Sequence, residues 1–417
     1  MKLSEIDLNN LDTWERGTPH EQFRLLRAED PVHRHAGGPG QEDYWCITRH
    51  TDVKRVSRDP ETFSSEAKGT VLRDPEPATL DQLRQIMLNM DPPRHRQYRA
   101  IVNKGFTPRM VKKLEPAIDA LVERIIDDVC ERGECDFVDE IASIMPMEVI
   151  CEMMGVPHSD RRAIYELGNK MVGFDDPELN PEGLPSSPSL GGAQQMQASI
   201  EMFLYASKLK ELYTREPADN LVTALLHAEV DGHRLSDLEF NSFFLLLAIA
   251  GNETTRTVTS NGMLALMRHP DQQAKLARDR SLVPSAVEEM LRFDPAVHSF
   301  RRTALRDSVI GDVEVVEGDK IIMWYPSANR DEEVFDEPDS FDVTRSPNDH
   351  LAFGIGEHFC LGSHLARLEL RKIFDGLMRR LPDMQLAAEP RRLRSNFVNG
   401  VKEMRVRFTP TRRVGKR

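Results

Sequence analysis

The sequence predicts a mainly α-helical fold with a small β region, in a single domain that spans residues 1–417. The longest helical pattern runs from Ser236 to about His269, and apolar residues recur at helical spacing through much of 114–170. No linker rich in Gly, Ser or Pro divides the chain, which is why one large domain is expected. The expected β-like runs are short: Tyr44–Thr48, Val309–Val316 and Lys320–Trp324.

The composition excludes some classes of protein. The 417 residues carry a formal net charge of −13, which argues against general nucleic-acid binding. The longest apolar run, Phe243 to Gly251, falls far short of the roughly 20 residues that span a membrane. Residues 1–7 lack the apolar region of a signal peptide. We therefore expect a cytoplasmic protein without a membrane anchor.

The N-terminal part predicts small elements in alternation. A helix is expected over Pro19–Glu29 and a turn at Gly37–Gly40, before the first β-like run. Asp52–Ser57 predicts a further helix, whereas 64–86 has no clear apolar period.

The next pattern places two cationic side chains together. Asp91 is expected to cap a helix whose first turn holds Pro92 and Pro93. His95 and Arg99, four residues apart, then share one helix face. Such a pair suits an acidic group, although spacing alone favours a solvated basic face.

The middle of the chain predicts helices separated by loops. The helical spacing after residue 114 is followed by a Pro-, Gly- and Ser-rich loop over 174–192 and a tight turn over 230–235. Cys130 and Cys135 are interpreted as helix-end residues, with a zinc site as the remote alternative because a second pair at zinc spacing is missing. The apolar residues expected on the buried face of the first helix are Ile118, Leu121, Ile125, Ile126 and Val129.

The longest helix begins at a capping box, Ser236 to Glu239, and at 1.5 Å per residue is about 50 Å long. A helix of this length crosses the domain and is expected to be mostly buried. Its centre nevertheless holds Gly251, Glu253 and Thr254, and buried polar groups are costly. The glycine would admit a planar group, and the Thr hydroxyl would bond the carbonyl four residues back. The structural alternative is a local packing kink.

The most informative stretch is 353–362, Phe-Gly-Ile-Gly-Glu-His-Phe-Cys-Leu-Gly. Its glycines permit a tight turn, and a helical pattern follows directly. Cys360 would thus lie at the start of a helix, where backbone N–H groups and the helix dipole favour a thiolate. A buried structural cysteine after a glycine turn is the ordinary alternative, and the complete Phe-Gly-x-Gly-x-His-x-Cys-x-Gly string argues against it.

This stretch resembles the cysteine loop of the cytochrome P450 family, and the resemblance extends over nearly the whole chain. It implies that Cys360 is the axial ligand of a haem b iron, that Phe353 packs beneath the haem, and that His358 bonds a haem propionate. It implies that Thr254 hydrogen-bonds bound dioxygen while Glu253 helps to relay protons. The remaining residues that it places at the haem are His95, Arg99, Ala250, Gly251, Arg302, Gly354 and Gly362.

Other motifs have structural or substrate-binding roles in this resemblance. Glu289 and Arg292, with Arg345, form the network that holds the cysteine loop. Arg302 is the third propionate contact, with Arg301 as its rival. The loop 174–192 matches the lid over the substrate channel. The chain closes with a turn and a strand over 396–408, and Val297, Phe397 and Val398 are expected to face the substrate pocket.

The implied function is that of a haem-thiolate monooxygenase. Such an enzyme inserts one atom of O2 into an unactivated C–H bond, with electrons from NAD(P)H through a ferredoxin reductase and a ferredoxin. A monomer is expected. Cations at Arg94, Arg96, Lys104, Arg109, Lys112 and Lys113 form either a docking face for an acidic electron donor or a solvated face.

Three segments resemble bacterial hydroxylases of sterol side chains: 250–256, 302–307 and 327–335. A large, mainly apolar substrate such as cholesterol or cholestenone, oxidised at a terminal methyl group, is therefore expected. Branched fatty acids or terpenes are the alternative substrates. A non-catalytic haem-thiolate sensor and a peroxygenase are the alternatives from other classes, and the Glu253–Thr254 pair argues against both.

Overall fold

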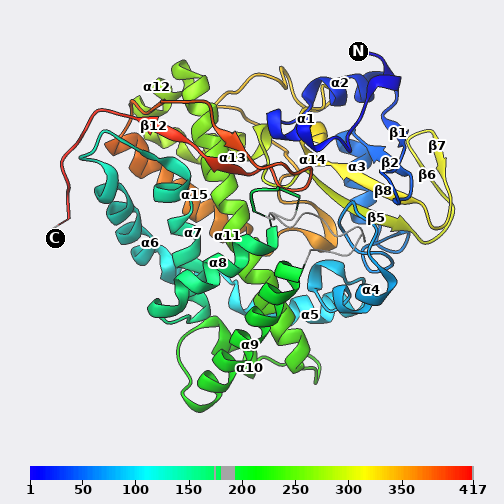
Figure 1. Cartoon of the computed structure of the whole chain (residues 1–417), viewed down its shortest axis with the longest axis horizontal. Helices are drawn as coiled ribbons and strands as arrows, with labels where there is room; N and C mark the ends of the chain where they lie inside the picture. Colours follow the sequence, from blue (N-terminus) through cyan, green and yellow to red (C-terminus); the bar gives the residue numbers. More distant parts are fainter. Residues whose placement is uncertain (173–174, 180–192, 416–417) are drawn as a thin grey trace.

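The computed structural model describes residues 1–172, 175–179 and 193–415, and helices dominate it (Figure 1). The predicted mainly α fold with a small β region is confirmed. The helices are α1 (Leu11–Arg16), α2 (His20–Glu29), α3 (His50–Arg58), α4 (Pro77–Leu83), α5 (Arg94–Val102), α6 (Pro108–Val129), α7 (Ile144–Met154), α8 (Arg161–Val172), α9 (Ala193–Arg215), α10 (Leu221–His227), α11 (Asp237–Arg268), α12 (Pro270–Arg278), α13 (Val283–Phe293), α14 (Tyr325–Ala328) and α15 (Ser363–Arg380).

The strands are short, and within the described residues they form four sheets. The strands are β1 (Val32–His35), β2 (Tyr44–Ile47), β3 (Phe63–Ser64), β4 (Glu134–Asp136), β5 (Ser299–Ala304), β6 (Ser308–Ile310), β7 (Val313–Val315), β8 (Lys320–Trp324), β9 (Gln385–Leu386), β10 (Arg391–Arg392), β11 (Val401–Glu403) and β12 (Arg405–Arg407). The largest sheet has the order β1-β2-β8-β5-β3, and β2 pairs with β8 in parallel.

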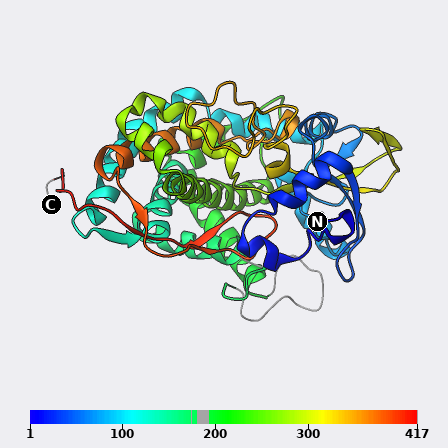
Figure 2. The same ribbon diagram turned by 90° about the horizontal axis from the view of Figure 1, so that it is seen from above.

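Helix α11 passes through the middle of the molecule (Figures 1 and 2). Its predicted capping box is present, because the Ser236 hydroxyl accepts from the Glu239 N–H and the Glu239 carboxylate accepts from the Ser236 N–H. The helix ends before His269, which precedes Pro270 as predicted. It packs against α7, α8, α9, α13 and α15, so most of its side chains are buried.

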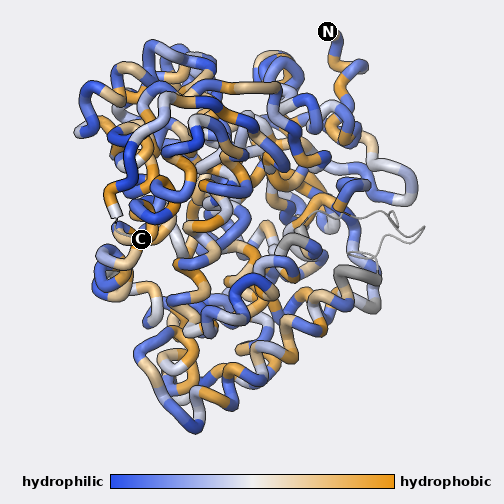
Figure 3. The backbone as a smooth tube through the Cα atoms, turned by 60° about the vertical axis from the view of Figure 1, so that its left-hand side comes forward, coloured by the Kyte–Doolittle hydropathy of each residue, from blue (hydrophilic) through white to orange (hydrophobic). Residues whose placement is uncertain are grey.

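Apolar and polar residues alternate along the helical backbone, as expected of helices that bury one face (Figure 3). One large apolar cluster joins the helices, and two smaller clusters lie at the five-stranded sheet. The predicted buried face of α6, from Ile118 to Val129, belongs to the large cluster. Within the described residues, none of the helices combines the length and the apolar character that a membrane span requires.

Several local predictions need correction. The Asp91 side chain does not cap α5: its carboxylate accepts from the Ser65 N–H at 2.8 Å and from the Ser64 hydroxyl. Cys130 follows the end of α6 as predicted, but Cys135 lies in β4 and not at a helix end.

The run predicted over 309–316 is a hairpin, β6 and β7, because Gly311 adopts a φ of +57° that turns the chain. The turn over 230–235 is confirmed by the Val230–His233 bridge. The segment 64–86 contains α4, which lacks the apolar spacing that predicts a helix. Most of the loop predicted over 174–192 lies outside the described residues.

Candidate active site

A cavity lies between the middle of α11 and the cysteine stretch 353–362. Ala250, Gly251 and Thr254 line it from α11, and Phe353 and Cys360 line it from the cysteine stretch. The long helix and the cysteine stretch, about 100 residues apart in the chain, therefore face one common space, as the sequence predicts.

The cysteine stretch forms a closed turn. The Cys360 N–H donates to the Phe353 carbonyl at 2.9 Å, and α15 begins three residues further on. Gly356 has a φ of +78°, and a Cβ atom there would lie 2.6 Å from the Ser57 carbonyl oxygen of α3. A side chain at Gly356 would therefore push the cysteine turn away from α3.

The surroundings of Cys360 act on its pKa in opposite directions. Burial raises the pKa of the thiol, while the Gly362 N–H and the charges of Arg99 and Arg367 act to lower it. The opposing groups do not outweigh burial. A cationic metal bound to the sulfur would supply the missing stabilisation of the thiolate.

Four cationic or basic side chains line the same cavity: His95, Arg99, Arg302 and His358. The His95 and His358 rings lie 4.2 Å apart, and neither ring nitrogen of the fully buried His95 has a hydrogen-bond partner. Burial, together with the Arg99 charge, lowers the pKa of His95 to about 4. Burial also lowers the pKa of His358, as do the neighbouring Arg302, His95 and Arg99.

A bound group with two carboxylates would satisfy these side chains. Arg302 donates to the Arg301 carbonyl at 2.7 Å, and among the described residues no carboxylate forms an ion pair with it. Arg301 instead pairs with Asp74 at 2.6 Å and is not part of the cavity lining. The orphaned nitrogens of His95 and the unpaired charge of Arg302 therefore fit the two propionates of a haem, with Arg302 better placed than Arg301.

The polar residues of α11 are divided between two environments. Thr254 lines the cavity, and its hydroxyl donates to the Ala250 carbonyl at 2.7 Å, four residues back as predicted. Glu253 is buried outside the cavity lining, where Arg256 donates to its carboxylate at 2.7 Å. Arg256 also donates to the Tyr165 hydroxyl of α8 at 3.2 Å, so this pair connects α11 with α8.

Gly251 lies between α7 and the cavity. A Cβ atom at this position would lie 2.8 Å from the Ile150 side chain of α7. The glycine therefore also allows α7 to pack closely against α11, a contact that sequence analysis did not anticipate. The backbone of Gly251 lines the cavity.

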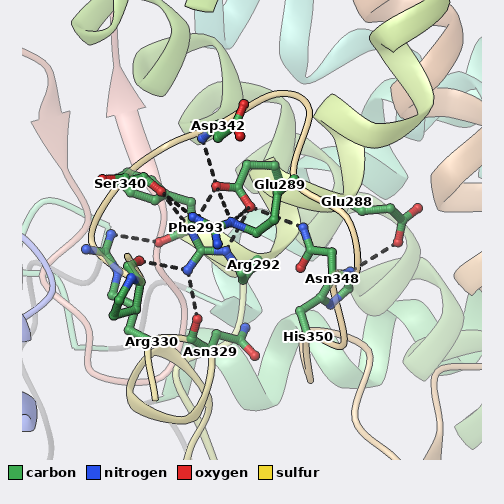
Figure 4. Close-up of polar contacts among 12 residues, drawn as sticks. Glu288, Glu289, Arg292, Phe293, Asn329, Arg330, Ser340, Asp342, Asn348 and His350 are labelled. Atoms are coloured by element: carbon green, nitrogen blue, oxygen red, sulfur yellow. Dashed lines mark hydrogen bonds and ion pairs between the residues drawn. The ribbon is translucent and has the colours of Figure 1, made fainter. Parts of the chain in front are cut away.

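The predicted network of Glu289, Arg292 and Arg345 is present, and Figure 4 shows Glu289 with Arg292. Arg292 donates to both Glu289 carboxylate oxygens at 2.8 Å, and both side chains are fully buried. Arg345 Nε lies 3.1 Å from the Glu289 carboxylate. Arg292 also donates to three backbone carbonyls, those of Asn329, Pro338 and Ser340, so the pair fixes the segment before the cysteine turn.

The predicted substrate-facing residues are only partly at the cavity. Val297 lines it, but Phe397 and Val398 do not. Val398 forms a backbone bridge with Val297, and the Phe397 ring centroid lies 5.8 Å from that of Phe300, so both residues contact residues of the lining. The apolar lining residues that sequence analysis missed include Met87, Leu88, Phe106, Ile150, Phe243, Val258, Leu291, Ala296 and Phe300.

Glu369 is a further cavity residue that sequence analysis missed. Burial raises its pKa to about 8, although a hydrogen bond from Thr255 acts in the opposite direction. Glu369 is therefore mainly protonated at pH 7. The available signal was its spacing, because it stands between Leu365 and Ile373 on the apolar face of α15.

Comparisons with known proteins agree with this geometry. The family model of cytochrome P450 matches residues 8–382. A steroid C26-monooxygenase of Rhodococcus jostii is 37% identical over 97% of this chain and 84% of its own length. A methyl-branched lipid omega-hydroxylase of Mycobacterium tuberculosis is 38% identical over 98% of this chain and 95% of its own.

Solved structures extend the agreement to the whole fold. A Mycobacterium marinum cytochrome P450 in complex with pseudoionone superposes with a TM-score of 0.88, at 36% identity over 97% of this chain and 98% of its own. A Bacillus megaterium enzyme in complex with corticosterone gives a TM-score of 0.81, at 30% identity over 94% and 98% of the two chains. With its cysteine turn facing the Thr254 side of a central helix, this chain belongs to the cytochrome P450 family of monooxygenases.

Proposed function

We propose that this monooxygenase hydroxylates a terminal methyl group at the branched end of a large, neutral, apolar substrate. A sterol side chain is the main candidate, and a methyl-branched lipid or a terpene is the alternative. The proposal is supported by the names of the relatives, a steroid C26-monooxygenase and a methyl-branched lipid omega-hydroxylase. Both names describe oxidation near the end of a chain on a large apolar molecule.

The observation that carries the proposal is the distribution of charge in the cavity. His95, Arg99, Arg302 and His358 form one group, which the two propionates of the haem would engage. Among the described lining residues, the α11 side of the cavity contributes Thr254 and Thr255 as its polar side chains, and its other side chains are apolar. A free carboxylate on the substrate would find no cation there, and this favours a neutral substrate over a free fatty acid.

The chain's own residues have distinct tasks in this reaction. Cys360 would hold the iron, with His95, Arg99, Arg302 and His358 on the propionates. When bound, the haem supplies the activation of O2 and the transfer of one oxygen atom. The Thr254 hydroxyl donates a hydrogen bond to the Ala250 carbonyl. The hydroxyl oxygen of Thr254 can therefore accept a hydrogen bond from a water and hold that water at the cavity.

Two carboxyl groups could resupply the proton that such a water gives up. Glu253 must first leave Arg256, because both of its oxygens lie within 2.7 Å of the guanidinium. Glu369 already carries a proton at pH 7 and lines the cavity. In this proposal Glu253 exchanges protons with the solvent. Glu369 holds one proton next to the cavity.

The electrons would come from NAD(P)H through a ferredoxin reductase and a ferredoxin, to a monomeric enzyme.

Arg99 lies beside the cysteine turn, where it donates to the Phe359 carbonyl at 2.6 Å. Of the cations around it, Arg94, Arg96 and Lys113 have carboxylate partners within the chain. These pairs favour a solvated face over a dedicated docking face for those three side chains.

Binding spectra of the haem-loaded enzyme test the substrate class. Cholestenone should shift the haem spin state at lower concentration than a small monoterpene, and at lower concentration than a methyl-branched fatty acid. Tighter binding of the fatty acid would contradict the argument from cavity charge, and tighter binding of the monoterpene would favour the terpene alternative. Turnover with O2 and a ferredoxin pair, compared with turnover on peroxide alone, separates the monooxygenase from a peroxygenase.

A further inference from the structure

A second carboxylate, that of Glu288, lies next to the Glu289 network on α13. Glu288 points away from Glu289 and toward His350 (Figure 4). Consecutive residues of a helix project about 100° apart, so α13 sends two adjacent carboxylates to two different clusters. Glu289 serves Arg292 and Arg345, whereas Glu288 pairs with Arg367 of α15.

The Glu288–Arg367 contact has the bidentate geometry that fixes a guanidinium in one plane. Arg367 Nε lies 2.8 Å from one carboxylate oxygen of Glu288, and Nη2 lies 2.8 Å from the other. His350 Nε2 lies 3.1 Å from the same carboxylate. Although burial alone would favour the neutral acid, these hydrogen bonds lower the pKa of Glu288 to about 2, so it is ionised at neutral pH.

The tautomer of His350 follows from its two contacts. Its Nδ1 accepts from the Ala352 N–H at 3.2 Å and therefore carries no proton. Its Nε2 must then be the protonated nitrogen that donates to Glu288. Arg367, whose guanidinium is always protonated, is the cation in bidentate contact with Glu288 and is the charge that Glu288 balances.

Arg367 connects this carboxylate to the iron ligand. Its guanidinium lies 4.4 Å from the centre of the Phe353 ring, and the Phe353 carbonyl accepts from the Cys360 N–H. Arg367 is also one of the two cations whose charge acts on the Cys360 sulfur. Glu288 fixes the orientation of the Arg367 guanidinium over the Phe353 ring. The Glu288 carboxylate also partly cancels the charge of Arg367.

We propose that Glu288 is a positioning residue that holds Arg367 against Phe353 and balances its charge, and so sets the electrostatic potential at the Cys360 thiolate and the reduction potential of the iron bound to it. This assignment concerns the chemistry common to the family and does not depend on the identity of the substrate. An uncompensated positive charge near the thiolate favours the ferrous state, which has one more electron. An uncompensated negative charge favours the ferric state.

The test measures the reduction potential of haem-loaded variants by spectroelectrochemistry. Glu288→Gln leaves Arg367 without its counter-charge and should raise the potential. Arg367→Met leaves Glu288 unbalanced and should lower it. Each shift is expected to be on the order of tenfold in the ferric-to-ferrous equilibrium, which is about 59 mV for one electron. The double variant removes both charges and should return toward the wild-type potential.

Control variants separate charge from packing. Arg371→Met removes a cation that lies 3.6 Å from the same carboxylate but is 43% exposed, so it should shift the potential much less than Arg367→Met. Arg367→Lys keeps the charge without the planar fork and should shift the potential less than Arg367→Met. This variant also keeps the test decisive if Arg367→Met does not fold.

The expected support is a pair of opposite shifts that cancel in the double variant. Shifts of the same sign in Glu288→Gln and Arg367→Met, or a double variant whose potential stays as far from that of the wild type as either single variant, would overturn the proposal. So would unchanged potentials accompanied by lower thermal stability, because that pattern describes a purely structural ion pair.

Discussion

Arg256 Nη2 lies 2.7 Å from Glu253 Oε1, one turn along the same helix, and this pair is buried beside the cavity without lining it. The neighbouring Thr254 lines the cavity instead. Glu253 and Thr254 therefore lie on different faces of α11. Glu253 can serve the cavity only after it leaves Arg256.

Removing the Arg256 side chain should lower the free energy of unfolding substantially. Arg256→Gln leaves the Glu253 carboxylate buried without its cation, and breaking such a pair typically costs about 3–5 kcal/mol in the free energy of unfolding. Chemical denaturation of the apoprotein and the haem-loaded protein measures this cost. Arg162→Gln breaks an exposed pair with Glu166 on α8 and should cost less than about 1 kcal/mol. Equal costs for the two variants would show that the Glu253–Arg256 pair behaves as a surface pair.

Thr254→Ala should uncouple electron flow from hydroxylation. Dioxygen should still bind and NAD(P)H should still be consumed, but more of the flux should escape as hydrogen peroxide because the positioned water is lost. Loss of one proton donor is typically worth about 10²–10⁴ in the step that it serves. Product, peroxide and NAD(P)H are measured together, and Thr254→Ser is the matched control that retains the hydroxyl. Wild-type coupling in Thr254→Ala would mean that the residue only packs in the helix.

Glu253→Gln should have a different effect from Thr254→Ala. It removes the group that exchanges protons with solvent but leaves the Thr254 hydroxyl in place. The whole cycle should slow, with less peroxide released per NAD(P)H than in Thr254→Ala. The same three-product assay checks this. A high peroxide yield in Glu253→Gln would indicate that the two residues act in one step.

Glu369 should make the stability of the protein depend on pH. Its pKa is about 8 in the folded state against 4.5 for an ordinary Glu, so the folded state holds the proton more tightly. This contribution is complete below about pH 4.5 and is lost as the pH rises through 8. Glu369→Gln should flatten the fall in unfolding free energy between pH 5 and 8, measured by denaturation at several pH values. Glu389→Gln, at a side chain that is 84% exposed, should leave the curve parallel to that of the wild type.

Cys360→Ser should abolish the thiolate spectrum of the reduced, carbon-monoxide-bound protein. Cys360 is the cysteine that lines the cavity, whereas Cys46, Cys130, Cys135 and Cys151 are buried elsewhere. Cys151→Ser is the matched control and should retain the spectrum. A Cys360→Ser protein with an unchanged spectrum would contradict the ligand assignment.

Local sequence patterns predicted the parts of the site that are contiguous in the chain. The 353–362 string, the cap at Ser236 and the i, i+3 pair of Glu289 and Arg292 each report a geometry set by neighbours a few residues apart. The helical spacing of α6 likewise fixed its buried face. In these cases the backbone period determines which side chains meet.

The missed features depend on contacts between distant segments. The side chain that packs against Gly251 is that of Ile150, about 100 residues earlier in the chain. A glycine in a sequence does not indicate which residue packs against it. Phe397 packs against Phe300 of β5, and of these two rings it is Phe300 that lines the cavity. The Asp91 carboxylate bonds the β3 end, at Ser64 and Ser65, and is therefore not available to cap its own helix. Each of these outcomes is decided by tertiary packing, which one segment of sequence cannot contain.

The parallel pairing of β2 with β8 has a consequence for how the chain is made. Trp45 and Cys46 take their places beside Ile321 and Ile322, which leave the ribosome roughly 280 residues later. At about 5–20 residues per second, the N-terminal strands wait between about 14 and 55 seconds for the strand that completes their sheet. During that interval β1 and β2 form only a two-stranded hairpin, which is marginal on its own. The strands β1 and β2 are thus made early but are among the last parts of the described structure to become stable.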